Sequence, residues 1–281
     1  LACTSGDEGA AKEGSTQISS GEATGALEAD APSVEAVSVK VEILPTYRGG
    51  PERVGNYDTG GENTIVGNLK WSFKTDHWIM SSIIPHEGTI YFGSTDKNVY
   101  GVDPSTGEEV WRFKTDGQVR TTPAIKDGTI YFGSRDDNVY AVDLETGAVK
   151  WKFATAGNVY SSPLVANDIV YIGSHDGYVY ALDTVSGEER WRFQAQDIIE
   201  GSPSTDGESI FVGSLDKRLY ALDPATGEET WKYNMGYAVY STPAVKDGIV
   251  YFGGLGRYYH AADAATGEQK WVVDHKVSGI E

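Results

Sequence analysis

The sequence predicts an all-β protein, a β-propeller of four-stranded blades, and three observations carry this prediction. Each 40-residue unit contains four short strand-like stretches, separated by turns rich in Gly and Asp. No window of the sequence keeps a helical period of apolar residues. Repetition of four short strands at a fixed period is typical of a propeller. Tryptophan marks the period, at Trp71, Trp111, Trp151, Trp191, Trp231 and Trp271.

The second unit shows the four predicted strands clearly, at 119–125, 129–134, 138–143 and 149–155. The first run is rich in Thr and contains Pro123. The other three alternate or run apolar, and each is bounded by Asp, Gly or Asn. We expect each unit to repeat this pattern as one antiparallel sheet.

A recurring Asp-x-x-Thr-Gly turn precedes each Trp from Trp111 onward. The Asp carboxylate can accept a backbone N–H two residues on, and the Gly supplies a left-handed residue. The Trp ring would then fill the wedge between neighbouring blades, with its indole N–H on a backbone carbonyl. A sugar-stacking role is disfavoured, because a binding aromatic need not recur in every unit. The turn residues are Asp103, Asp143, Asp183, Asp223 and Asp263, with Gly107, Gly147, Gly187, Gly227 and Gly267.

The amino-terminal part of the chain differs from the repeats. Residues 1–38 carry seven acidic residues against Lys12 alone and contain no aromatic residue, so they cannot bury enough apolar surface to fold. We expect a disordered acidic tether at 1–38, an entry segment at 39–68 and repeats at 69–281.

Cys3 is the single cysteine of the chain, which excludes an intrachain disulfide and a multi-cysteine metal cage. Leu1-Ala2-Cys3, followed by small and acidic residues, resembles the end of a bacterial lipobox. In that motif the cysteine receives lipid after cleavage of a signal peptide. The resemblance implies lipidation at Cys3, and a chance cysteine near the end is the alternative.

Both ends of the repeat region carry partial units. Residues 69–75 match an outermost strand without a preceding sheet, and 277–281 match the start of another innermost strand. We therefore expect five complete blades plus partial strands at both ends, as in a truncated ring of at least six blades. A compact five-bladed ring with frayed ends is the alternative.

The motif Ala-x-Asp-x-x-Thr-Gly-x-x-x-Trp occurs at 141–151, 221–231 and 261–271, and at 181–191 with Ser186 in place of the Thr. It resembles the tryptophan-docking motif of the PQQ-like (pyrroloquinoline quinone repeat) β-propeller family. Residues 47–55, with Tyr47, Arg48 and Pro51, resemble the leader of non-enzymatic members. Enzymatic members hold PQQ over calcium, use a catalytic Asp and commonly carry an adjacent Cys pair. This chain has one Cys and about half the propeller that those enzymes need.

The resemblance therefore implies the non-enzymatic, BamB-like lipoprotein branch, with no catalytic residue and no PQQ or other cofactor. It implies a scaffold on the extracytoplasmic side of the cell envelope that binds an envelope protein or peptide through loops and sheet edges. Two alternatives remain open: a fragment of a PQQ-dependent quinoprotein dehydrogenase, and a sensor ectodomain that binds a small molecule.

The formal charge of −18 opposes binding to nucleic acid and adsorption to acidic lipid. Contact with a membrane would then depend on the lipid anchor alone, and neutral or cationic partners are favoured. The five histidines show no metal-ligand spacing, so no metal site is predicted.

Binding residues should occupy positions that differ between units, because recurring residues build the scaffold. The most variable position lies near the start of each innermost strand, with a second variable position two residues earlier. An ion pair between Arg120 and Glu200 is the structural alternative to ligand binding. The candidates at the mouth of the central channel are Trp78, Met80, Arg120, Tyr160, Glu200 and Tyr240.

Two further features belong to the turns. Asp96, Asp136, Asp176 and Asp216 recur at the fourth position of a Gly-Ser-x-Asp turn and are expected to cap it. The fifth unit replaces that pattern with residues 253–260, in which Arg257 to His260 form either a recognition surface or simple sequence drift.

Overall fold

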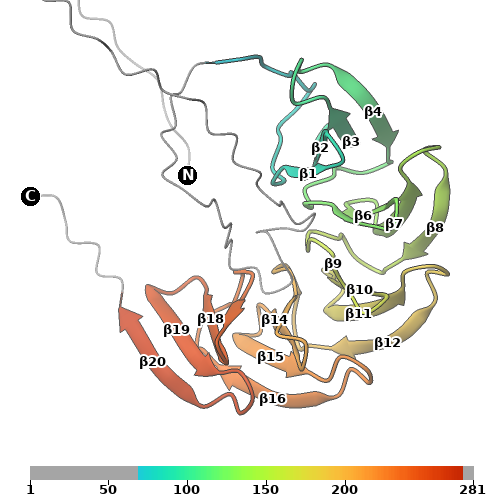
Figure 1. The fold of residues 1–281 in the computed structure, drawn as a ribbon. Coiled ribbons are helices and arrows are strands. Elements are labelled where there is room, and N and C mark those ends of the chain that lie inside the picture. The colour runs from blue at the N-terminus through green and yellow to red at the C-terminus, as the bar shows by residue number, and fades with distance from the viewer. Residues whose placement is uncertain (1–68, 275–281) are drawn as a thin grey trace, which may run out of the picture. The chain divides into compact units, whose positions relative to one another are not determined.

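A computed structural model describes residues 69–274, and within this range all regular structure is β-strand. Twenty strands form five four-stranded antiparallel sheets (Figure 1). The strands are β1 (Ile84–His86), β2 (Thr89–Gly93), β3 (Asn98–Val102), β4 (Glu109–Lys114), β5 (Ala124–Lys126), β6 (Thr129–Ser134), β7 (Asn138–Asp143), β8 (Val149–Ala154), β9 (Leu164–Ala166), β10 (Ile169–Gly173), β11 (Tyr178–Asp183), β12 (Glu189–Gln194), β13 (Ser204–Thr205), β14 (Ile210–Gly213), β15 (Arg218–Leu222), β16 (Glu229–Asn234), β17 (Ala244–Lys246), β18 (Ile249–Gly253), β19 (Tyr258–Asp263) and β20 (Gln269–Asp274).

Each sheet is a meander in which four consecutive strands pair in chain order. The sheets follow one another along an arc, with the short first strand of each at the inside and the long fourth strand at the outside (Figure 1). Five complete blades are therefore confirmed. The third and fourth strands of every sheet share a bulge at the same place, between residues 141 and 142 in the second unit.

The two middle strands of each sheet are mostly buried: all of β6 and all of β15 except Arg218 are buried, whereas Tyr259 of β19 is 58% exposed. Both faces of such a strand pack against neighbouring sheets, and this explains why their sequences are almost continuously apolar. One core cluster, for example, joins Leu164 and Tyr171 of the third sheet to Ile210 and Tyr220 of the fourth. Hydrophobic burial between blades thus stabilises the stack.

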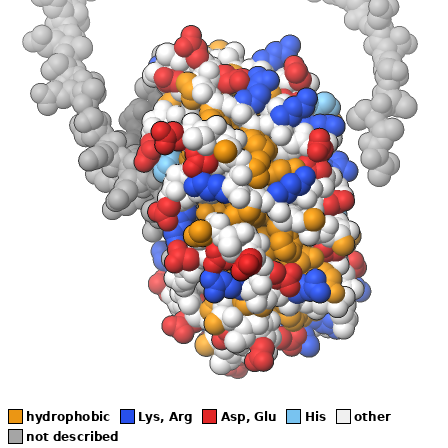
Figure 2. Space-filling view, turned by 90° about the vertical axis from the view of Figure 1, so that its right-hand side faces the viewer, with side chains coloured by type: hydrophobic (Ala, Val, Ile, Leu, Met, Phe, Trp, Pro, Cys, Tyr) orange, Lys and Arg blue, Asp and Glu red, His pale blue; other side chains and the backbone are white. Residues whose placement is uncertain are grey.

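The outer strands face solvent on one side and carry ion pairs there. Arg112 pairs with Glu109 at 2.6 Å, and Lys232 pairs with Glu229 at 2.9 Å. On the face shown in Figure 2, acidic and basic side chains are interspersed, with hydrophobic side chains between them. No helix within residues 69–274 has the length and apolar character needed to cross a membrane.

The strand expected at 119–125 is shorter than predicted, since only Ala124–Lys126 pairs within its sheet. Pro123 has no N–H to donate. The Thr121 hydroxyl donates to the Gly133 carbonyl at 2.9 Å, and the Thr122 N–H donates to the Ser162 hydroxyl at 2.9 Å. Side-chain hydroxyls therefore replace the expected ladder.

The position of Thr122, which holds Ser or Thr in every unit, links successive blades around the inside of the arc. The backbone N–H at this position donates to the side-chain hydroxyl of the residue 40 positions later. The donors and acceptors are Ser82 to Thr122 (2.8 Å), Thr122 to Ser162 (2.9 Å), Ser162 to Ser202 (2.8 Å) and Ser202 to Thr242 (3.3 Å). Four hydrogen bonds thus fix the spacing of the innermost segments.

The tryptophans occupy the wedge between blades, as predicted. The indole N–H of Trp71, Trp151, Trp191 and Trp231 donates to a carbonyl of the next unit at 2.8–3.0 Å. The hydrogen-bond prediction is wrong for Trp111: its ring packs against the core between the first two sheets, nearly parallel to Phe113 on its own strand, but its buried Nε1 has no partner within residues 69–274. Trp271 is 41% exposed, and no sheet of the described residues follows it.

The segment at 69–75 forms no strand pairing with a described residue, but Trp71 and Phe73 pack against the core of the first sheet. It therefore contributes the outer-strand side chains that the repeat predicts. The expectations for the tether at 1–38, the entry segment at 39–68, lipidation at Cys3 and the partial strand at 277–281 lie outside the described residues.

Candidate functional site

The recurring Asp of each Asp-x-x-Thr-Gly turn caps that turn, as the sequence predicts. Asp183 Oδ1 accepts the N–H groups of Val185 and Ser186 at 2.9 Å each, and Gly187 adopts a positive φ of 73°. Hydrogen bonds from the Thr146 N–H and hydroxyl lower the pKa of Asp143 to about 2. These carboxylates stabilise their own turns, so candidate ligand-binding residues have to be sought elsewhere.

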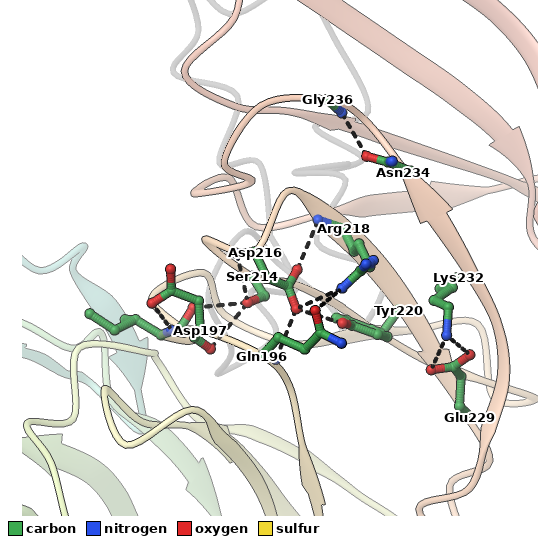
Figure 3. Close-up of polar contacts among 11 residues, drawn as sticks. Gln196, Asp197, Ser214, Asp216, Arg218, Tyr220, Glu229, Lys232, Asn234 and Gly236 are labelled. Atoms are coloured by element: carbon green, nitrogen blue, oxygen red, sulfur yellow. Dashed lines mark hydrogen bonds and ion pairs between the residues drawn. The ribbon is translucent and has the colours of Figure 1, made fainter.

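The Asp of the Gly-Ser-x-Asp turn does more than cap it. Asp216 Oδ1 accepts the Arg218 N–H at 3.0 Å, while Oδ2 accepts the Tyr220 hydroxyl at 2.5 Å and the Gln196 N–H at 3.0 Å (Figure 3). Gln196 belongs to the segment that enters the blade, so one carboxylate ties the entry, the turn and β15 together. Asp96, Asp136 and Asp176 make the same connection to the tyrosine four residues later.

Protonation of this carboxylate–tyrosine pair is set by its burial and hydrogen bonds. Burial and the Asp216 carboxylate raise the pKa of Tyr220 to about 12. Burial alone would raise the pKa of Asp136, but hydrogen bonds from Asn138, Tyr140 and the Asp116 amide lower it. Burial and the Asp136 carboxylate also raise the pKa of Tyr140, so the Asp136–Tyr140 pair remains carboxylate and phenol near neutral pH, and its role is structural.

Residues that differ between units converge on the inner side of the second, third and fourth blades. We call Arg120, Arg135, Tyr160, His175 and Glu200 the channel-mouth cluster. The Tyr160 and His175 rings stack with centroids 4.3 Å apart and an angle of 15°. The guanidinium carbons of Arg120 and Arg135 lie 5.3 and 5.4 Å from the Tyr160 centroid. Glu200 Oε2 lies 3.8 Å from His175 Nε2.

Neutral amides hold Arg135 in place. Its Nε donates to Asn158 Oδ1 at 3.0 Å, and its Nη1 donates to Gln118 Oε1 at 2.8 Å. Asn158 in turn donates to Asp137 Oδ1 at 2.9 Å. Asn158 and Gln118 therefore orient the Arg135 guanidinium directly, and Asp137 acts on it only through Asn158, so none of these contacts neutralises its charge.

His175 is neutral near pH 7, because burial lowers its pKa and nearby Arg135 lowers it further against the opposing effect of Glu200. Two buried nitrogen atoms of the cluster, His175 Nε2 and Arg120 Nε, have no hydrogen-bond partner in the described part of the chain. A buried donor without a partner costs free energy, which a bound ligand could recover.

The cluster corrects and extends the prediction from sequence. Arg120 and Tyr160 do come together, but no ion pair joins Arg120 to Glu200 within residues 69–274, because Arg120 lies over Tyr160 and Glu200 faces His175. Arg135 and His175 were missed. Their position follows each Gly-Ser and varies from unit to unit, so the criterion that selected Arg120 would have found them.

The other candidates do not join the cluster. Trp78 and Met80 are 70% and 54% exposed. Tyr240 lines a hollow of about 410 Å³ on the fifth blade, together with Ser241 and residues 253–259.

The fifth blade lacks both members of the carboxylate–tyrosine pair, since Gly256 stands at the position of the Asp and His260 at the position of the Tyr. His260 is buried, and its Nδ1 lies 3.0 Å from the Tyr233 hydroxyl. Both members of the pair are therefore absent from this unit, and Tyr233 is the hydrogen-bonding partner of His260.

The histidine makes stability depend on pH. Burial lowers the pKa of His260 below 6.5, so the unfolded chain takes up the proton first as the pH falls. We expect the free energy of unfolding contributed here to be constant above pH 6.5 and to decrease below it. Urea unfolding at pH 7.5 and 5.0 should show a smaller pH difference for His260→Gln than for the unchanged protein. An identical difference in both would contradict the assignment, and His175→Gln provides an independent comparison.

The residues of 69–274 do not fit a calcium–PQQ centre. No group of three or more His, Cys, Asp or Glu side chains in this range could hold a metal ion. Calcium takes six to eight oxygen ligands. We therefore derive no chemistry through this cofactor.

Solved structures share the fold at low sequence identity. BamB from Moraxella catarrhalis is 22% identical, with a TM-score of 0.63 over 73% of this chain and 66% of that one. The quinohemoprotein alcohol dehydrogenase ADHIIG from Pseudomonas putida HK5 is 21% identical, with a TM-score of 0.62 over 74% and 44%. Quinohemoprotein alcohol dehydrogenase from Comamonas testosteroni is 17% identical, with a TM-score of 0.65 over 74% and 45%. The chain thus spans 66% or less of each. No curated protein matches the sequence.

The five four-stranded sheets and the tryptophan-docking repeat define a PQQ-like β-propeller. The family model described as outer membrane protein assembly factor BamB matches residues 95–198 and 175–280, about two thirds of the chain. The chain belongs to this BamB family.

Proposed function

We propose that this chain is a non-catalytic scaffold of the cell envelope, anchored by lipid at Cys3, whose propeller binds a partner protein or peptide. The channel-mouth cluster is the observation that carries the binding role. Its members differ between units, lie together on three blades and keep buried nitrogen atoms that have no partner among residues 69–274. The recurring Asp216, in contrast, has its hydrogen bonds satisfied within the scaffold.

The envelope location rests on different support. The family is named for an outer membrane assembly factor, and the sequence at 1–3 resembles a lipobox. An acidic tether of 38 residues would give a flexible coil with a reach of roughly 30–35 Å, enough to hold the propeller away from a bilayer surface. The scaffold would then meet partners on the extracytoplasmic side.

Site-specific photocrosslinking tests the binding role. A photoreactive phenylalanine analogue at Tyr160 should give one dominant adduct in intact cells, because this ring lies at the centre of the cluster. The same analogue at Val185, which is 83% exposed on an outer turn, is the control and should give none. Equal labelling from both positions would refute a specific site at the channel mouth.

Metabolic labelling tests the anchor. Palmitate should be incorporated into the unchanged protein and not into Cys3→Ala, because the thiolate is the group that accepts the lipid. An unlabelled wild-type protein would rule out the anchor and leave the binding role standing.

Titration with PQQ and calcium tests the remaining alternative, an enzyme fragment. The fold likeness to quinohemoprotein dehydrogenases motivates it. We expect no stoichiometric change in cofactor absorbance, and such a change would overturn the non-catalytic assignment.

A further inference from the structure

Two arginines of the channel-mouth cluster differ from all the others that the structure describes. Arg120 and Arg135 form no ion pair with a carboxylate in residues 69–274, although acidic residues outnumber basic ones in the chain. The other five arginines each pair with one, as Arg112–Glu109, Arg190–Asp183, Arg192–Glu189, Arg218–Asp216 and Arg257–Asp274. The two unpaired guanidinium groups lie on the same tyrosine ring.

Two like charges held on one ring repel each other, and the repulsion is stronger where water is partly excluded. Arg120 Nε is buried, and Tyr160 contributes a cation–π attraction that does not remove the charge. An anion placed against both guanidinium groups would relieve the repulsion. Carboxylate has the planar geometry that the guanidinium fork binds in bidentate fashion.

Acidic side chains near the cluster do not neutralise the two arginines. Within residues 69–274, Glu200 forms no ion pair with either arginine and lies 3.8 Å from His175 Nε2, and Asp137 accepts from Asn158. Asp176 accepts the Tyr180 hydroxyl at 2.8 Å and the Ala156 N–H at 2.8 Å. Asn158 and Gln118 fix Nε and Nη1 of Arg135, whereas its Nη2 has no hydrogen-bond partner among residues 69–274. The cluster therefore presents oriented donors whose counter-ion has to come from elsewhere.

We propose that Arg120 and Arg135, with Tyr160 between them, bind a carboxylate group of the ligand at the channel mouth. This inference rests on the binding function proposed above and names the chemistry that the partner supplies. The carboxylate belongs either to an acidic side chain of a peptide or to a free small carboxylate. The chain is acidic overall, so its net charge does not attract an acidic ligand from a distance. The attraction between the ligand carboxylate and the two guanidinium groups therefore acts at short range, through their hydrogen bonds.

Calorimetric titration of the full chain tests the proposal with three probes: a capped tetraglutamate peptide, its tetraglutamine counterpart and succinate. We expect tetraglutamate to bind and tetraglutamine not to bind. Arg120→Gln and Arg135→Gln should each weaken binding about tenfold or more, since each removes a charge-assisted hydrogen-bonding group. Arg112→Gln removes the same charge from an outer strand and should leave the affinity unchanged.

Each outcome decides the question. Succinate binding as tightly as the peptide assigns a free carboxylate as the ligand, and binding of the peptide alone assigns an acidic segment. Three results would overturn the proposal. They are tetraglutamine binding as tightly as tetraglutamate, both arginine variants binding tetraglutamate as tightly as the unchanged protein does, and no binding of either tetraglutamate or succinate. Arg120→Lys keeps the charge without the fork, so a folded protein with reduced affinity is available if a glutamine variant unfolds. A specific adduct at Tyr160 with no acid binding would leave the scaffold function intact and reject only its carboxylate chemistry.

Discussion

Replacement of Asp216 by alanine is expected to lower the free energy of unfolding by about 3–5 kcal/mol. The carboxylate is 4% exposed and accepts hydrogen bonds from the Gln196 and Arg218 N–H groups and from the Tyr220 hydroxyl. Alanine would leave the Arg218 N–H and the Tyr220 hydroxyl without an acceptor at a half-buried site, and it would release the Gln196 N–H to solvent. Arg218 Nη1, 3.7 Å away, would lose its counter-ion as well.

Urea unfolding followed by circular dichroism measures this effect, and two variants control it. Asp197→Ala removes an exposed carboxylate that accepts only from its neighbour Ile198, so its effect should stay within about 0.5 kcal/mol. Tyr220→Phe removes one donor together with its need for an acceptor and should cost about 1 kcal/mol. A loss below 1 kcal/mol for Asp216→Ala would show that the three hydrogen bonds do not fix the blade entry.

Replacement of Gly187 by alanine is expected to cost about 2–4 kcal/mol, and replacement of Gly147 only about 1–2 kcal/mol. Both glycines have positive φ, 73° and 69°, so both alanines pay the left-handed backbone penalty. A Cβ at Gly187 would also lie 2.6 Å from the buried Trp151 ring of the preceding blade. A Cβ at Gly147 would meet nothing within 4 Å, because Trp111 is turned toward Phe113.

The difference in stability between Gly187→Ala and Gly147→Ala isolates the packing of the tryptophan ring on the glycine, because both variants carry the same cost of a left-handed backbone. Chemical denaturation of the two proteins under the same conditions measures the difference. Equal stabilities would show that the Trp151 ring can move aside at no cost. A second substitution, Trp151→Phe, should narrow the gap, because a smaller ring leaves room for the added methyl group.

The channel-mouth cluster shows how far sequence reasoning reached. Variation among units identified Arg120, Tyr160 and Glu200, because a repeat separates scaffold positions from the rest. It gave no distances, however, and the contact between Arg120 and Tyr160 depends on how two blades are rotated against each other. The same rotation brings Arg135 to the ring from a turn 25 residues away in the preceding unit, while His175 stacks on the ring from a turn of the same unit, 15 residues away.

The sequence by itself determined the blade count of the described region, the strand order and the turn chemistry, because these depend on local spacing within 40 residues. Trp71, Trp151, Trp191 and Trp231 took the positions that their spacing predicts. Only the tertiary structure decided what depends on the packing of one blade against the next. That packing turned Trp111 away from Gly147 and joined Ser82 to Thr242 through a series of N–H to hydroxyl hydrogen bonds. It also placed Arg120 and Arg135 on one tyrosine ring, with no ion pair to a carboxylate of residues 69–274.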